Sequence, residues 1–161
     1  MNRWMFERNG GFTLIELMIA VAILTIGVSL AIPEFLRWHT QSRLRQATSE
    51  IATQLVLARM AAMNRNRNVD VTVQVVGGLV HLSAAASGAS VIKDITFPTQ
   101  VPSIVGSPVT VSFSSLGIKT SGGTGTQLIG VCDTYKRQYS VSVIPSGKVN
   151  WSVNPTGNPC P

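Results

Sequence analysis

Glu16 is the residue that most clearly requires a charged or hydrogen-bonding partner, because its carboxylate lies inside an apolar run from Phe12 to Ile32. An acid at the centre of a lone membrane-spanning helix costs roughly 2.5–3.5 kcal/mol on insertion scales, so such a group usually has a partner. Cleavage between Gly11 and Phe12 would create a cationic α-amine close to that carboxylate in the sequence. The spacing therefore predicts that Glu16 is the counter-charge of an N-terminus at Phe12.

The apolar run is long enough to cross a bilayer. Its roughly 21 residues give about 30 Å of helix. Arg3 and Arg8 precede it, which by the positive-inside tendency places the N-terminus in the cytoplasm and the rest outside. Two other interpretations stay open: a secretory signal peptide cleaved after Ala31, and a plain single-pass anchor. The acid inside the apolar run, and a helical pattern that continues past Ala31, both disfavour the signal peptide.

The segment Gly11-Phe12-Thr13-Leu14-Ile15-Glu16-Leu17, with its basic leader and apolar run, resembles the class III signal of type IV pilins and type II secretion pseudopilins. The resemblance implies that a prepilin peptidase of the inner membrane cleaves after Gly11 and methylates the amine of Phe12. It also implies that Glu16 pairs with the N-terminal amine of a neighbouring pilin or pseudopilin subunit in a filament. This resemblance covers the N-terminal third of the chain.

Beyond the apolar run, the pattern favours an amphipathic helix. Pro33 removes one backbone hydrogen bond, so a kinked or loosened turn is expected there before the helix resumes to about Asn66. In the resemblance, a proline at this place marks a segment that can melt in the filament. Arg43, Glu50, Gln54 and Arg65 lie largely off the apolar face. One stripe at spacings of three and four is expected to pack on a sheet: Leu44, Ala47, Ile51, Leu55, Ala58 and Ala62.

After Asn66 the period changes to two, which indicates strands. Residues 69–75 alternate apolar and polar, and Gly77-Gly78 is a strong signal for a two-residue hairpin into Leu79–Leu82. Residues 145–148 read as the turn of a C-terminal hairpin. Residues 83–90 and 114–126 are expected to be loops, since they are rich in Ser, Gly, Ala and Thr. Further strands are predicted at Val91–Phe97, Val109–Phe113, Gln127–Val131, Tyr139–Ile144 and Val149–Val153.

These elements predict an α+β fold with a long N-terminal helix, half transmembrane and half amphipathic, packed on an antiparallel β-sheet head. The resemblance implies that this fold is pilin-like. The expected divisions are a leader (1–11), a transmembrane or filament-core helix (12–32), an amphipathic helix (33–66) and a β-rich head (67–161). Net charge is +6. The leader carries Arg3, Arg8 and Glu7, so its removal would leave +5, an excess that suits anionic partners without identifying one.

The end of the helix resembles the FimT/GspH group of minor pilins and pseudopilins. Members often read "ARSEAIxRNxxV" there, and Ala58-Arg59, Arg65-Asn66 and Val69 match, while Met60 and Ala61 stand where Ser and Glu are common. The resemblance implies a non-enzymatic structural subunit at or near a pilus tip that helps initiate assembly. The alternative is a minor pseudopilin of a type II secretion system. The expected location is the inner membrane with a periplasmic head, and then a surface pilus or a periplasmic pseudopilus.

Cys132 and Cys160 are the two cysteines of the chain. The topology places both outside the cytoplasm, where disulfides persist. A disulfide would close a loop of about 29 residues and stabilise the fold by about 3–4 kcal/mol in the chain-entropy model. A zinc site is disfavoured, because the cysteines lack metal-type spacing and His39 and His81 are far apart in sequence. A nucleophilic Cys132 would need a base that the sequence does not supply.

Some FimT-like pilins bind DNA through a Gly-Arg-x-Arg motif in the late hairpin. The matching residues here are Gly147-Lys148-Val149-Asn150. Lys148 keeps the positive charge of the first arginine but lacks its planar guanidinium, and Asn150 replaces the second arginine with a neutral side chain. Lys136, Arg137 and Lys148 are the candidate DNA-binding residues, expected to form one patch with weak, salt-dependent affinity. A solvated basic rim that keeps the head soluble is the alternative.

No catalytic site, metal site or cofactor is predicted. Asp70, Asp94 and Asp133, the acids beyond the helix, each stand alone and are expected to be solvated turn or strand-end groups. Gly122–Gly125 lacks the lysine and the following helix of a phosphate-binding loop. It is expected to be a flexible hairpin tip.

Overall fold

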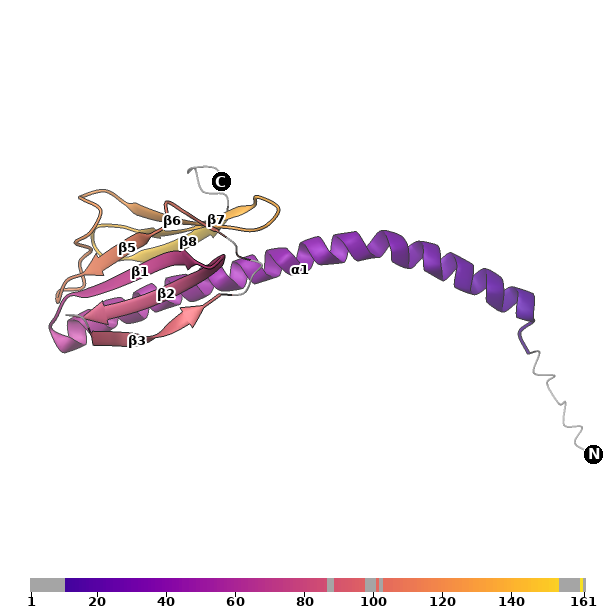
Figure 1. Ribbon diagram of the computed structural model, residues 1–161, viewed down its shortest axis with the longest axis horizontal. Coiled ribbons are helices and arrows are strands. Elements are labelled where there is room, and N and C mark those ends of the chain that lie inside the picture. Colours follow the sequence, from indigo (N-terminus) through magenta and orange to yellow (C-terminus); the bar gives the residue numbers. More distant parts are fainter. Residues whose placement is uncertain (1–10, 87–88, 98–100, 102, 154–159, 161) are drawn as a thin grey trace, which may run out of the picture. The chain divides into compact units, whose positions relative to one another are not determined.

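The structure is a computed structural model that describes residues 11–86, 89–97, 101, 103–153 and 160, apart from the side chain of Leu30. The chain divides into two compact units, Met1–Trp38 and His39–Pro161. Figure 1 traces the elements along the chain: α1 Leu14–Arg65, β1 Val69–Val76, β2 Leu79–Ala86, β3 Ala89–Thr96, β4 Ser103–Val105, β5 Val109–Phe113, β6 Gln127–Cys132, β7 Gln138–Val143 and β8 Val149–Val153.

Pro33 lies inside one continuous helix. The helix therefore runs through Pro33 without stopping and resuming, while the kinked or loosened turn expected there stays a prediction. Proline lacks an N–H and so removes the bond to the carbonyl of Ser29, but the many other i→i−4 bonds of a 52-residue helix remain. Nearby hydroxyls also bond within the helix: Thr25 Oγ1 donates to Val21 O at 2.7 Å, and Ser29 Oγ donates to Ile26 O at 2.8 Å.

The head is built on two antiparallel sheets rather than a single one. Their strand orders are β3-β2-β1-β5 and β4-β6-β7-β8. The stripe of α1 from Leu44 to Ala62 is buried and belongs to the same core cluster as the inward-facing residues of both sheets, as predicted. These residues include Val71 of β1 and Val141 of β7. Figure 1 shows the C-terminal part of α1 running beside the strands.

Gln54 is the exception on the helix, because it is 8% exposed rather than turned to solvent. Its Nε2 donates to Glu50 Oε1 at 2.6 Å, while its own Oε1 has no hydrogen-bond partner among the described residues. The expectation that Gln54 lies off the buried face is therefore wrong. Its aliphatic stem continues the apolar surface of the helix. The hydrophobic pattern of the sequence could not show this, because glutamine counts as a polar residue.

The first hairpin forms where Gly77-Gly78 predicted it. Both glycines have positive φ, 59° and 77°, and the strands pair from Val76 with Leu79 onward. Such values at both central residues are those of a type I′ turn, which matches the twist of the flanking strands. The last hairpin also forms as expected, since Ile144 N donates to Lys148 O and Val143 pairs with Val149.

Two strand predictions need correction. Residues 83–90 are not a loop, because β2 continues to Ala86 and β3 begins at Ala89. Alanine and serine have weak strand propensity, but Ala84 and Ala86 face the core, and pairing with β1 and β3 overrides that preference. The short strand β4 was not predicted at all, and it pairs with β6 through Ile104 and Val131.

Candidate functional site

The N-terminal segment begins with exposed residues 11–13, and helix α1 starts at Leu14. Thr13 caps the helix: its Oγ1 accepts from the backbone N–H of Glu16 at 3.3 Å, and its carbonyl accepts from Leu17 N at 3.1 Å. Residues 1–10 of the predicted leader, with Arg3 and Arg8, lie outside the described residues.

Glu16 therefore lies in the first turn of α1, where its carboxylate is exposed. The positive end of the helix dipole favours an anion at this position. A new ammonium group at Phe12 would lie beside that same positive end, so it would need a carboxylate close by. The cap thus fixes Glu16 in the first turn of α1, four residues after Phe12.

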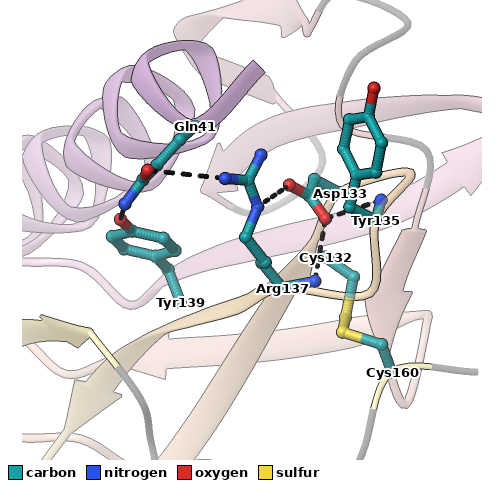
Figure 2. Close-up of polar contacts among 7 residues, drawn as sticks. All are labelled: Gln41, Cys132, Asp133, Tyr135, Arg137, Tyr139 and Cys160. Atoms are coloured by element: carbon teal, nitrogen blue, oxygen red, sulfur yellow. Dashed lines mark hydrogen bonds and ion pairs between the residues drawn. A yellow bond between two sulfur atoms is a disulfide. The ribbon is translucent and has the colours of Figure 1, made fainter. Parts of the chain in front are cut away.

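A second polar cluster lies at the turn between β6 and β7. Asp133 is 4% exposed, so the prediction of a solvated aspartate is wrong. Its Oδ1 accepts from the backbone N–H groups of Tyr135 and Arg137 at 2.9 and 2.8 Å, and its Oδ2 accepts from Arg137 Nε at 2.7 Å (Figure 2). The buried carboxylate is thus satisfied by two backbone donors and one cation.

This turn is joined to two other parts of the head. Gln41 of α1 donates through Nε2 to the hydroxyl of Tyr139 at 3.3 Å and accepts through Oε1 from Arg137 at 3.4 Å (Figure 2). A disulfide joins Cys132, at the end of β6, to Cys160. Helix, turn and C-terminal region are therefore held together at one end of the head. An Asp that directly follows a strand cysteine and precedes an Arg by four residues was the available sequence signal.

Arg59 holds two loops together from the side of α1. Its Nε donates to Gly117 O at 2.8 Å, and its NH2 group donates to Ser146 O at 3.2 Å. These carbonyls belong to the loop after β5 and to the β7–β8 turn, one from each sheet. The resemblance singled out Arg59, but nothing in the sequence showed which carbonyls it would bind.

Gly147 has a packing reason in the same place. Its φ is 80°, and a Cβ built on it would lie 1.9 Å from Gly117 O. Two backbones therefore approach closely where the two sheets meet. Gly147 was matched in the sequence to a DNA-binding motif, but its geometry is accounted for by this contact alone.

The three candidate DNA-binding residues do not form one patch, and that prediction is wrong. Lys136 lies just before the first residue of β7. Lys148 lies in the β7–β8 turn, which follows the last residue of β7. A six-residue strand spans about 20 Å, so the two lysines lie at opposite ends of the sheet. The guanidinium of Arg137 is already bound to Asp133.

Among the described residues, no three His, Cys, Asp or Glu side chains gather as a metal site would need. A groove of about 450 Å³ between α1 and the end of β3 is lined by Arg43, Glu50, Ile95 and Phe97, among others. Its carboxylate, Glu50, accepts from Gln54, and the lining contains a serine, Ser49, but no histidine that could act as its base. This groove offers no recognisable catalytic group.

Comparison with known proteins gives two family matches. Residues 8–32 match the "Prokaryotic N-terminal methylation motif", and residues 47–147 match "Type II transport protein GspH". The type IV major pilin protein PilA of Myxococcus xanthus (strain DK1622) is 48% identical over 44 residues. That alignment covers 27% of this chain and 20% of PilA, so the chain spans a small part of this curated relative.

Solved structures agree at the level of fold. The type IV minor pilin FimU of Pseudomonas aeruginosa (strain PAO1) superposes with a TM-score of 0.53 at 16% identity, covering 74% of this chain and 94% of FimU. A second crystal form gives 0.51 at 17% identity, with 72% and 96% covered. The relatives are structural subunits rather than enzymes. The chain belongs to the GspH family, within the FimT/GspH group of type IV minor pilins and pseudopilins.

Proposed function

We propose that the chain is a minor type IV pilin, a structural subunit at or near the pilus tip that helps to initiate assembly. The observation that carries this proposal is the joining, in one chain, of a capped apolar helix with Glu16 in its first turn to a GspH-type β head. The likeness of the head to FimU in fold supports a pilus rather than a secretion filament.

The chemistry begins with processing. In this proposal prepilin peptidase hydrolyses the Gly11–Phe12 bond in the inner membrane and methylates the new amine. Both residues are exposed and precede α1, so the scissile peptide is not held within helical hydrogen bonding. The leader is then residues 1–11, and the mature chain starts one residue before the Thr13 cap.

Assembly follows from charge neutralisation. The carboxylate of Glu16 pairs with the Phe12 amine of a neighbouring subunit, because two opposite charges in an apolar layer are far less costly together than apart. Residues 12–32 then form the filament core, residues 33–66 carry the amphipathic helix, and residues 67–161 form the rest of the head. Gln41 and Arg59 support this division of labour, since both fasten α1 to the sheets.

A pseudopilin of a type II secretion system is the second candidate, and the match to the type II transport protein GspH family favours it. Deletion of the gene, with complementation by the wild-type gene, separates the two. Loss of surface pili with normal export of secretion substrates supports the minor pilin. Loss of export with normal pili supports the pseudopilin, and normal pili with normal export contradict both.

A role in DNA uptake stays a prediction of the resemblance. The structure adds no support to it, since Lys136 and Lys148 lie at opposite ends of β7. The check is titration of the full chain with duplex DNA at low and moderate salt. Binding that is weakened equally by Lys136→Ala and Lys148→Ala would revive a shared surface. No binding at low salt would remove DNA from the list of partners.

A further inference from the structure

Two aromatic side chains extend the exposed apolar surface of α1 past the end of the apolar run. Phe35 and Trp38 are 62% and 63% exposed. They are three residues apart, so they share one side of the helix, and their ring centroids are 6.1 Å apart. Trp38 is also the last residue of the first compact unit. The pair thus marks the end of the helical segment that precedes the head.

The length of the helix places this pair at a definite depth. At 1.5 Å per residue, Phe12 to Ile32 spans about 30 Å, which equals the thickness of a bilayer's hydrocarbon core. Trp38 lies about 9 Å farther along, so Phe12 to Trp38 spans about 39 Å, close to the thickness of a bilayer with its headgroups. The rings therefore fall in the headgroup layer on the side of the head.

The distribution of side chains around the helix agrees with that depth. Leu24, Val28, Ala31, Phe35 and Trp38 follow one another at spacings of three and four and form a single stripe. Glu34 and Arg37 lie on the adjoining side, 3.8 Å apart, and both are well exposed. One side of this segment suits lipid and the other suits water.

We propose that Phe35 and Trp38 form an interfacial anchor that binds the phospholipid headgroup layer on the side of the head. Aromatic rings favour this layer because they are apolar in body and polarisable, and the indole N–H can still reach water or a lipid carbonyl. The stripe is continuous with the apolar run. That run belongs to α1, which among the described residues is long and apolar enough to span a membrane. The adjoining ion pair needs water, which a buried helix–helix contact would remove.

The anchor would set the depth of the whole helix before assembly. With Trp38 held in the headgroup layer, Phe12 lies at the opposite face and Glu16 lies about one turn inside it. The scissile bond and the acid are then held at fixed heights for the peptidase and for the neighbouring subunit. This inference holds for a pilus and for a pseudopilus alike.

The test uses the fluorescence of Trp38 in the full chain. Trp4→Phe with Trp151→Phe leaves Trp38 as the single tryptophan, and the protein is reconstituted into phosphatidylcholine–phosphatidylglycerol vesicles. Brominated phosphatidylcholines carry the quencher either near the headgroups or near the bilayer centre. We expect quenching to be strongest with bromine near the headgroups. Strongest quenching at the centre, or quenching by aqueous iodide alone, would overturn the proposal.

Two controls keep the result specific. Leu116→Trp in the background Trp4→Phe, Trp38→Phe and Trp151→Phe places the reporter on an exposed loop of the head, where we expect quenching by iodide and by no brominated lipid. Phe35→Ser should reduce the headgroup quenching of Trp38, whereas Phe35→Leu should retain more of it, with circular dichroism confirming that α1 is intact in both. Unchanged quenching in Phe35→Ser would contradict a shared anchor.

A second copy of the chain is the competing occupant of this stripe. Dilution of the protein in lipid separates copies without removing the bilayer. We expect the depth profile of Trp38 to be unchanged on dilution. A profile that appears only at high protein-to-lipid ratio would assign the stripe to helix–helix contact and would refute the lipid anchor.

Discussion

The carboxylate of Asp133 holds the β6–β7 turn in one conformation. It binds the backbone at two points and the guanidinium of Arg137 at a third, and Arg137 in turn reaches Gln41 on α1. Lys136, in the same turn, has a positive φ of 59° and points its charge to solvent. The guanidinium of Arg137 is thus paired with the buried acid, whereas the side chain of Lys136 stays exposed.

Replacing this acid by its amide should destabilise the head. Asp133→Asn keeps the size of the side chain but removes the negative charge, leaving Arg137, whose side chain is 32% exposed, without its ion pair. We expect a loss of about 2–3 kcal/mol in the free energy of unfolding, below the range for a fully buried pair. Urea unfolding of the detergent-solubilised full chain, followed by near-ultraviolet circular dichroism, measures it.

The matched control is Asp94→Asn on β3, because Asp94 is exposed. We expect that variant to stay within about 0.5 kcal/mol of the wild type. Equal effects of the two substitutions would show that the buried ion pair contributes nothing beyond a surface charge.

At the scale of elements, the contact between the β7–β8 turn and the loop after β5 closes one end of the head. Arg59 bonds to both segments, and the backbone of Gly147 lies against that of Gly117. The two sheets have separate strand orders, and this contact helps to join them, together with the shared packing on α1 and a hydrogen bond from Gln127 Nε2 of β6 to Thr110 O of β5.

Gly147→Ala should therefore destabilise the head more than Gly77→Ala. Both glycines have positive φ, so the backbone strain of an alanine is similar at the two positions. The added Cβ at Gly147 would meet Gly117 O at 1.9 Å, whereas at Gly77 it would meet nothing within 4 Å. We expect an excess loss of about 1–3 kcal/mol for Gly147→Ala, as in overpacked sites. Identical urea midpoints for the two variants would contradict the close approach of the loops.

The sequence predicted elements wherever a local pattern was strong. Val69–Val75 alternates between apolar and polar residues, and Gly77-Gly78 is a strong signal for a two-residue turn. The first hairpin was therefore predictable. Ala84 and Ala86 were missed because small residues carry little strand preference until a neighbouring strand pairs with them. β4 has three residues, too few to show a period.

The candidate sites divide in the same way. Gly11, Phe12 and Glu16 form a contiguous motif, so the sequence alone could propose their roles. Gln41 and Arg59 bind partners that are distant in sequence, and those of Arg59 are backbone carbonyls. Such contacts leave no spacing to read in a single chain, and they emerge only when helix and sheets are packed together.

At the scale of the whole molecule, a disulfide joins Cys160 to Cys132 at the end of β6. Removing both as Cys132→Ala with Cys160→Ala should lower the free energy of unfolding by about 3–4 kcal/mol, the chain-entropy value for a loop of this length. Urea unfolding under the conditions used above measures the change. The wild type treated with a reductant is the comparison, and a double variant as stable as the oxidised wild type would refute a stabilising disulfide.

Glu16→Val tests whether the helix and the head have separate roles. Valine keeps α1 apolar but removes the counter-charge for the Phe12 amine, so the protein should insert in the membrane and fold its head yet fail to join filaments. Quantitative immunoblots of membrane and sheared filament fractions measure both properties. Thr25→Val, within the same helix, is the control and should assemble normally. Normal incorporation of Glu16→Val would show that the carboxylate has no part in assembly.

The N-terminus of the mature protein tests the central claim most directly. Mass spectrometry of N-terminal peptides from membrane and filament fractions identifies the first residue and its modification. The account predicts a chain that starts at Phe12 with a methylated amine, in wild type and in Glu16→Val membranes where cleavage precedes assembly. A chain that starts at Met1, or at Ile32 after a secretory cleavage, would contradict it.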